Sequence, residues 1–227
     1  MEPVGFALFA HCFTCNKNLT AVRNIARSLI NNAIAFLLFD FTGLGESEGE
    51  FENTNFSSNI EDLLAAANFL KTEYKAPDIL IGHSLGGAAV IFVSTKIESV
   101  KAIATIGAPC SPGHITHLLK TGLDEINKNG IAEISIGGRS FTIKKQFLLD
   151  IEEQRLDEIV HRMKKPLLIM HSPQDTVVSI ENAAHIYKSA THPKNFISLD
   201  GADHLLSNSA DSLFAGEIIA TWAKRYL

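Results

Sequence analysis

The chain has 227 residues, of which 46% are hydrophobic and 20% are charged, and its formal net charge at pH 7 is -5. That length supports one sizeable core, so we expect a single domain over residues 1–227. The mildly acidic balance gives no electrostatic support for binding nucleic acid or an anionic membrane. No apolar run reaches the roughly 20 residues that span a bilayer. No signal peptide follows Met1, so we expect a cytoplasmic protein.

The first half of the chain alternates short apolar runs with amphipathic runs. This alternation is typical of a parallel sheet covered by helices. In chain order we expect a strand at Val4–Ala10, a helix at Leu19–Asn31, a strand at Ala33–Phe39, a helix from Ser57 or Ser58 to about Tyr74, a strand at Asp78–Ile81, a helix at Ala88–Val93 and a strand at Val100–Ile106.

The alternation is interrupted at residues 110–165 and then resumes. The interruption contains helical runs at Ile115–Asn127 and Leu148–Met163 around a hairpin at Glu133–Ile143. Such insertions usually cover the ligand crevice of an α/β fold, so we expect a cover here. The remaining expected elements are strands at Pro166–Met170 and Asn195–Leu199 and helices at Glu181–Ala190 and Ala210–Tyr226. The predicted fold class is therefore α/β, a doubly wound, mostly parallel sheet of about six strands with a small inserted cover.

One serine lies between two glycines in Gly82-His83-Ser84-Leu85-Gly86, at the junction of a predicted strand and helix. A sharp strand-to-helix turn forces its central residue into a strained, positive φ, and side chains at the flanking glycines would collide with neighbouring backbone. This geometry would expose Ser84 Oγ at the C-terminal edge of the sheet, above a helix N-terminus. The alternative is a glycine-rich structural turn.

An acid and a histidine follow later strands. A serine hydroxyl becomes a useful nucleophile only when a base takes its proton and a carboxylate orients that base. Asp175 and His204 each lie one loop past a strand, so we expect both at the same sheet edge as Ser84, in the order serine, acid, histidine. Asp175 could also be a plain turn residue. Asp200 and Asp203 are rival acids.

Acyl transfer also needs N–H donors for the developing oxyanion. Leu85 N–H, at the start of the helix after the serine, is one candidate. The loop after the first strand supplies the other, with Phe13 N–H preferred to Cys12 N–H. Four further residues are expected to line the site: His11, Cys12, His83 and His171. Among these, His171 is the second choice, after His204, for the functional histidine.

The three cysteines, Cys12, Cys15 and Cys110, do not make a disulfide framework. Cys12 and Cys15 form a C-x-x-C pair, but no second pair at zinc spacing follows and no helix begins at the first cysteine. We therefore expect ordinary reduced thiols, with oxidation sensing as the alternative. We predict no metal and no cofactor.

Together these motifs resemble the α/β-hydrolase superfamily across nearly the whole chain. The residues that carry the resemblance are the loop Ala10–Cys15, the run Asp40–Ser47, the Ser84 turn, Asp175 and His204. More narrowly, the cysteine-bearing loop, the D-F-T-G-L-G-E-S-E-G run and Ser57–Leu63 resemble the hydrolase half of bacterial proteins that fuse a hydrolase to an OsmC-type domain. The family usually has glycine where this chain has Cys12.

The superfamily also usually begins with two antiparallel strands that this sequence does not show before Val4. Their absence would leave Ala33–Phe39 as an apolar edge strand, and such edges pair readily. We therefore expect either a homodimer that closes over this edge or a start upstream of Met1.

The resemblance implies a serine hydrolase akin to small esterases and to prolyl-oligopeptidase-type peptidases. Our leading hypothesis is an esterase-like enzyme whose Ser84 attacks an ester, thioester or amide of a small-molecule acyl substrate. A small peptidase is the alternative enzyme, and a non-catalytic, thiol-regulated binding protein is the alternative of another class. Apolar residues of the insertion predict an apolar ceiling over the site: Ile115, Leu118, Leu119, Phe141 and Phe147.

Overall fold

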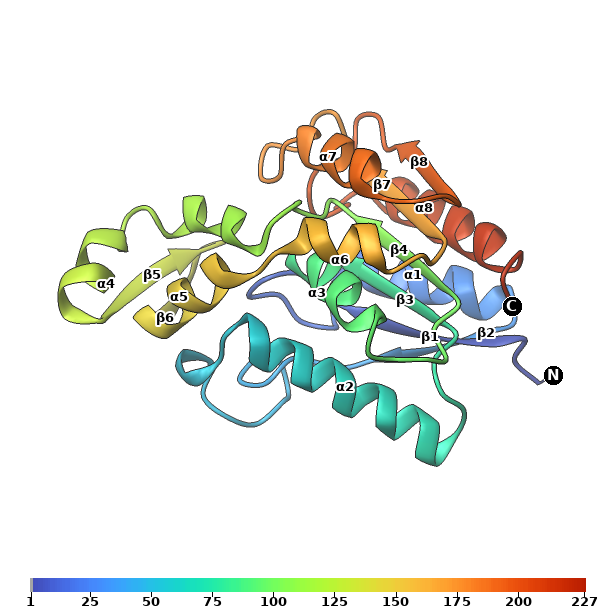
Figure 1. Ribbon diagram of the computed structural model, residues 1–227, viewed down its shortest axis with the longest axis horizontal. Coiled ribbons are helices and arrows are strands. Elements are labelled where there is room, and N and C mark those ends of the chain that lie inside the picture. Colours follow the sequence, from blue (N-terminus) through green and yellow to red (C-terminus); the bar gives the residue numbers. More distant parts are fainter. Residues whose placement is uncertain (1) are drawn as a thin grey trace.

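Six parallel strands form the central sheet of the computed structural model, which describes residues 2–227 (Figure 1). Across the sheet the order is β2 (Ile34–Leu38), β1 (Gly5–Ala10), β3 (Ile79–His83), β4 (Ala102–Ile106), β7 (Leu167–His171) and β8 (Lys194–Ser198). Every neighbouring pair is parallel. From β1 the chain first passes to the edge strand β2 and then returns across β1 through β3, β4 and β7 to β8 at the other edge, which confirms the predicted doubly wound α/β class.

Helices cover both faces of the sheet, and the strands are apolar on both sides for that reason. Leu8 and Leu80 face the helices α2 and α3, whereas Phe9 and Ile81 face α1 and α8. This alternation follows from the two-residue period of a strand. One face is covered by α1 (Thr20–Asn31) and α8 (Ser209–Ala223), and the other by α2 (Phe56–Glu73), α3 (Leu85–Ser94), α6 (Leu156–Arg162) and α7 (Glu181–Ser189).

The insertion forms a cover that extends beyond the carboxyl ends of the strands, to the left in Figure 1. Its hairpin, β5 (Ile131–Ile136) and β6 (Arg139–Lys144), matches the predicted one. The predicted helix at Ile115–Asn127 is instead a 3-10 segment, η2 (Pro112–Leu119), followed by a short helix, α4 (Leu123–Asn129). The predicted helix is interrupted at Gly122, because the hairpin packs against this residue. A Cβ atom on Gly122 would lie 2.7 Å from Ile134 Cγ1.

The second predicted helix of the cover, Leu148–Met163, is also divided. Helix α5 (Lys145–Glu153) ends where Gln154 turns extended, and α6 then packs against α3 and α7 of the main fold. The start of α2 differs from the prediction as well. Its N-cap is Asn55, whose side chain accepts from Ser58 N–H at 2.7 Å while Ser58 Oγ accepts from Asn55 N–H. A reciprocal pair satisfies two free donors at once, so the helix begins before the expected serines.

Strand β2 lies at one edge of the sheet, where the sequence placed it. Apart from Ile34 its side chains are only half-buried. Its pairing with a second copy of the chain stays a prediction. Within residues 2–227, no helix combines the length and the apolar character needed to cross a bilayer.

Candidate active site

A single residue, Ser84, makes the turn between β3 and α3. Its backbone has φ 55° and ψ -125°, which is the strained conformation expected from the motif. The two flanking glycines make close backbone contacts. A Cβ atom on Gly82 would overlap the Gly86 carbonyl oxygen, and one on Gly86 would overlap the carbonyl oxygen of Ala10 at the end of β1. The segment of residues 82–86, here called the elbow, is therefore fixed by main-chain contacts. Ser84 lies at the sheet edge, but only 7% of its surface is exposed, so it is buried and not open as the motif predicted.

Ser84, His204 and Asp175 form one hydrogen-bonded chain. His204 Nε2 lies 3.0 Å from Ser84 Oγ, and His204 Nδ1 lies 2.7 Å from Asp175 Oδ2. An ionised carboxylate only accepts, so Nδ1 carries the ring proton and Nε2 is left to accept from the serine hydroxyl. The three residues come from the loops that follow β3, β7 and β8, and parallel strands bring these loops to one edge.

The carboxylate of Asp175 is held in place by its second oxygen. Asp175 Oδ1 accepts from the backbone N–H groups of Val177 and Val178, each at 2.8 Å. Burial raises the pKa of Asp175, but the hydrogen bonds from His204 and these two N–H groups outweigh it, so the pKa lies below its usual value. The group is therefore ionised near neutral pH and favours a protonated His204 Nδ1.

The two rival acids make only local hydrogen bonds. Asp200 accepts from Ser198 Oγ at 2.6 Å, and Asp203 accepts from Ser207 N–H at 2.8 Å. Neither carboxylate forms a hydrogen bond with His204. Both residues shape the loop between β8 and α8, and the structure pairs His204 with Asp175 instead.

Two of the expected site histidines lie beside the chain of hydrogen bonds rather than in it. His83 Nε2 is 2.7 Å from the carbonyl oxygen of His204, and His171 Nε2 is 2.7 Å from that of Val178 and 3.5 Å from Asp175 Oδ2. Burial lowers the pKa of both rings, that of His83 to about 3. Both are thus neutral donors. Within residues 2–227, no three His, Cys, Asp or Glu side chains are grouped to hold a metal ion.

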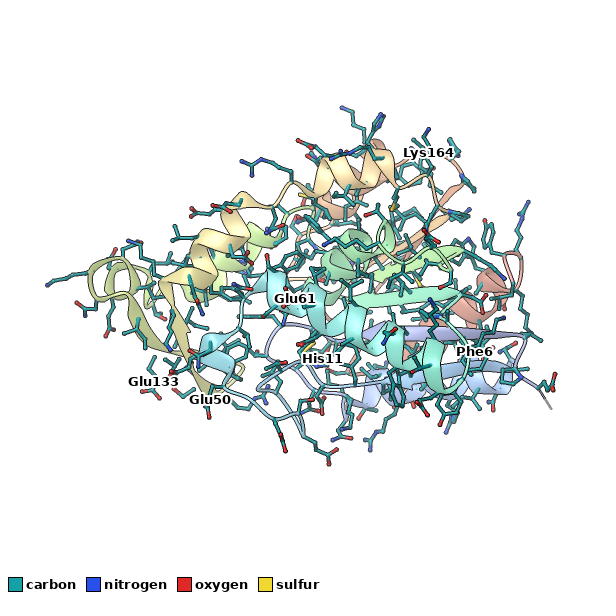
Figure 2. The ribbon with its side chains drawn as sticks, turned by 60° about the horizontal axis from the view of Figure 1, so that its bottom comes forward. Phe6, His11, Glu50, Glu61, Glu133 and Lys164 are labelled. Atoms are coloured by element: carbon teal, nitrogen blue, oxygen red, sulfur yellow. A yellow bond between two sulfur atoms is a disulfide. The ribbon has the colours of Figure 1, made fainter. Side chains whose placement is uncertain are left out.

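His11, labelled in Figure 2, is the first residue of the loop after β1, and its side chain is buried. Its Nδ1 lies 2.9 Å from the Cys12 carbonyl oxygen and its Nε2 accepts from Phe41 N–H at 3.2 Å. A carbonyl only accepts, so Nδ1 carries the proton and the neutral ring satisfies both neighbours. Burial lowers the pKa of His11 and thereby favours this neutral form. The His11 ring therefore joins the Cys12 carbonyl to the Phe41 N–H group.

The expectation of two reduced thiols in this loop is wrong, because Cys12 and Cys15 form a disulfide. Cys15 N–H donates to the Cys12 carbonyl oxygen at 3.1 Å, and Thr14 has a positive φ of 58°. This tight turn brings the two Cα atoms to 5.2 Å, within the usual range for a disulfide. Residue spacing alone did not reveal the turn. Cys110 is a free thiol whose pKa is raised by burial.

Phe13 and Leu85, whose N–H groups are predicted to bind an oxyanion, both line one small cavity. It has a volume of about 10 Å³, the space of about one water molecule, and it lies beside the nucleophile, because Gly86 lines it but Ser84 and His204 do not. In the part of the chain that the structure describes, neither backbone N–H has a hydrogen-bond acceptor. Both groups are thus free to donate to an anionic oxygen.

The cover and the segment before α2 close over the loop that follows β1, residues 11–15, which we call the oxyanion loop. Phe13 packs against Phe147 and Phe51, with ring centroids 5.3 and 5.9 Å apart, and Phe51 packs against Phe141 at 5.1 Å. The Arg139 guanidinium donates to the carbonyl oxygen of Thr14, which lies between the two disulfide-bonded cysteines.

The cover is also tied to the 3-10 turn η1 (Phe51–Asn53), which precedes α2. Lys144 lies 2.8 Å from the Glu52 carboxylate. Figure 2 shows Glu133 of the hairpin and Glu50, just before η1, at the same end of the molecule. Of the predicted ceiling residues, Phe147 contacts Phe13 directly and Phe141 contacts Phe51. The others pack in or against the main hydrophobic core: Ile115, Leu118 and Leu119.

Sequence reasoning missed two residues near the site. His114 Nε2, in the cover, lies 3.4 Å from the Val177 carbonyl oxygen in the Asp175 loop. No motif marks His114, and its place in a predicted cover was the one available signal. Gly107, directly after β4, is the other, because a Cβ atom there would lie 3.3 Å from Asp175 Oδ2 and 3.4 Å from His204 Nδ1. Its signal was a glycine at the end of a buried strand.

The strand order, the elbow and the cover define an α/β-hydrolase. A family model described as serine aminopeptidase, S33, matches residues 7–130, which is more than half of the chain. The chain belongs to this family within the α/β-hydrolases. The narrower resemblance to hydrolases fused to OsmC-type domains stays a prediction.

Several known proteins are similar to this chain. The esterase domain of a Rhodothermus marinus protein is 52% identical to this chain and has a TM-score of 0.80. The match covers 100% of this chain and 89% of that one. Est1E from Butyrivibrio proteoclasticus with bound ferulic acid is 20% identical and has a TM-score of 0.81. The match covers 100% of this chain and 90% of that one. Mitochondrial palmitoyl-protein thioesterase ABHD10 from Bos taurus is 23% identical over 90% of this chain and 68% of its own length. The chain spans between 61% and 68% of the curated relatives it matches.

Proposed function

We propose that the protein is a serine hydrolase of esterase type, which cleaves a carboxylic ester, thioester or amide through an acyl-enzyme on Ser84. The observation that carries this proposal is the chain of hydrogen bonds from Ser84 Oγ to His204 Nε2, at 3.0 Å, and from His204 Nδ1 to Asp175, at 2.7 Å. These distances are those of a nucleophile, a general base and the acid that orients the base.

Acylation begins when Ser84 Oγ attacks the substrate carbonyl carbon and its proton passes to His204 Nε2. The imidazolium is stabilised by the ionised Asp175, and it then gives the proton to the leaving group as the acyl-enzyme forms. Water repeats the sequence, with His204 again taking and returning a proton, and releases the acid. Asp175 stays ionised throughout, as its lowered pKa requires.

The oxyanion of each tetrahedral intermediate accepts hydrogen bonds from Phe13 N–H and Leu85 N–H. This assignment is supported by the place of Leu85 at the start of α3, directly after Ser84, and by the lack of any backbone acceptor for these N–H groups among residues 2–227. Donors of this kind are each worth about 10²–10³ in kcat because they are already aimed where charge develops.

Esters and thioesters are the preferred substrates. The Rhodothermus marinus relative is named an esterase domain and shares 52% of its residues with this chain, and the Bos taurus relative is named a thioesterase. The family model carries a peptidase description, so an aminopeptidase is the second candidate. An intact set of Ser84, Asp175 and His204 argues against a non-catalytic binding protein.

A substrate panel tests this proposal. Acyl p-nitrophenyl esters and acyl-CoA thioesters of graded chain length are assayed beside aminoacyl anilides, with Ser84→Ala as the control. We expect turnover of at least one ester or thioester and none by the variant. Preferential cleavage of the anilides would favour the peptidase, and turnover that survives in the Ser84→Ala protein would contradict the proposal.

A further inference from the structure

His83 connects the nucleophile to the loop that carries the base. It directly precedes Ser84, and its Nε2 lies 2.7 Å from the carbonyl oxygen of His204. The rings of His83 and His204 also pack together, with centroids 5.2 Å apart and planes inclined by 36°. His83 has only 4% of its surface exposed, so this contact is sheltered from water.

The direction of this hydrogen bond follows from its acceptor. A carbonyl oxygen can only accept, so His83 Nε2 carries the proton and donates it. Burial lowers the pKa of His83 to about 3, and the ring is a neutral donor throughout the pH range in which a serine hydrolase works. His83 therefore exchanges no proton in the reaction, and its hydrogen bond persists on both sides of neutral pH.

The His204 carbonyl has no other hydrogen bond in the part of the chain that the structure describes. Other backbone N–H groups of its loop donate to residues outside the Ser84 turn. Gly201 N–H donates to Gln174 Oε1 at 2.6 Å, and Leu206 N–H donates to Asp203 within the loop. The hydrogen bond from His83 is thus a tie from the elbow to the backbone of His204 itself.

We propose that His83 is a positioning residue, which sets the distance between Ser84 Oγ and His204 Nε2 by holding the His204 main chain against the elbow. The inference rests on the proposed function, because it assigns His83 a role in the reaction of Ser84. A displacement of about 1 Å in a reacting pair can cost about 10²-fold in rate, so a single hydrogen bond at this point has a large kinetic effect.

Two substitutions test the role of the Nε2 donor. His83→Gln places an amide N–H near the former Nε2, whereas His83→Leu keeps a similar volume without a donor. We expect the leucine variant to lose about 10- to 100-fold in kcat with KM within about threefold of wild type, and the glutamine variant to recover most of the loss. The acid limb of the kcat/KM pH profile should stay in place, because His83 is neutral across it.

Equal kcat values for wild type and the leucine variant would overturn the inference, and so would a shifted acid limb. If the leucine variant does not fold, His83→Asn replaces it, because its shorter amide reaches the Nδ1 position and not Nε2. A lower kcat for asparagine than for glutamine then supports the tie, and equal values overturn it. Failure of the proposed function is distinguishable, since wild type itself would then show no turnover that depends on Ser84.

Discussion

The elbow and the oxyanion loop each offer one N–H group to the site, but they are held in different ways. The elbow is fixed by main chain, since the carbonyl oxygens of Gly86 and Ala10 lie where side chains on its glycines would be. The oxyanion loop is fixed by side chains, namely His11 at its start, the Cys12–Cys15 disulfide within it and Arg139 from the cover above it.

This difference predicts how each region responds to change. The contacts of the elbow are short backbone contacts, so a single added atom displaces the strand or the helix. The contacts of the oxyanion loop are several and independent, and each one shares the task of placing Phe13 N–H. We therefore expect substitutions at the elbow and its partners to abolish activity and substitutions at the loop to reduce it in steps.

The largest effect is expected at the acid that orients the base of the elbow serine. Asp175→Asn removes the carboxylate that selects the tautomer of His204, and kcat should fall by about 10⁴-fold. The matched control is Asp200→Asn, because the carboxylate of this rival acid accepts from Ser198 Oγ and forms no hydrogen bond with His204. Steady-state hydrolysis of the best ester from the panel measures both. A large loss in the Asp200 variant, with Asp175→Asn active, would reverse the assignment.

Gly86→Ala should follow, because its Cβ atom would overlap the carbonyl oxygens of Ala10 and His11. The elbow and β1 must then separate, which we expect to cost about 1–3 kcal/mol in unfolding free energy and about 10²-fold in kcat. Gly113→Ala, in the cover, meets nothing nearer than Ser111 Oγ at 3.5 Å and is the control. Urea unfolding and ester hydrolysis measure the two effects. Wild-type stability and activity of the Gly86 variant would contradict the view that short backbone contacts fix the elbow.

Loss of the disulfide should have a smaller effect. Replacing both Cys12 and Cys15 by serine opens a ring of four residues and is expected to cost at most about 2 kcal/mol in stability, with about a tenfold fall in kcat as Phe13 N–H becomes less fixed. Dithiothreitol should lower the activity of wild type equally and leave the variant unchanged. Cys110→Ser is the control. An unchanged kcat after reduction, verified by thiol alkylation, would show that side-chain contacts place the loop without the disulfide.

The last prediction concerns stability in acid and involves no change in kcat. His83 at the elbow has its pKa lowered to about 3, whereas an unfolded histidine titrates near 6.5. Protons therefore bind the unfolded chain more readily between these values, and stability is full above pH 6.5 and falls as the pH decreases. His83 alone should make the protein about 2 kcal/mol less stable at pH 5 than at pH 8. His11 in the oxyanion loop contributes in the same direction.

Urea unfolding of wild type and His83→Gln at both pH values measures this contribution. The variant should lose part of the pH dependence because its amide does not titrate. An identical pH dependence in the two proteins would contradict the burial of a neutral imidazole at this position.

The sequence predicted the parts of the site whose geometry is determined locally. The strained turn at Ser84, and the place of Asp175 and His204 one loop past their strands, follow from glycine chemistry and strand order. The disulfide depended on a positive φ at Thr14, and a positive φ cannot be predicted from a residue type that rarely adopts it. The broken helices of the cover depended on tertiary packing, such as the hairpin against Gly122, that periodicity does not contain. His114 reaches the site only because the cover folds back over it.

Covalent labelling tests most directly whether Ser84 is a nucleophile activated by His204. Wild type, Ser84→Ala and His204→Ala are each treated with a fluorophosphonate, and the adducts are located by intact mass and peptide mapping. We expect one adduct per wild-type chain at Ser84, none in the serine variant and a labelling rate at least about 10³-fold lower in the histidine variant. An unlabelled wild type, or an adduct at another residue, would contradict this role of Ser84.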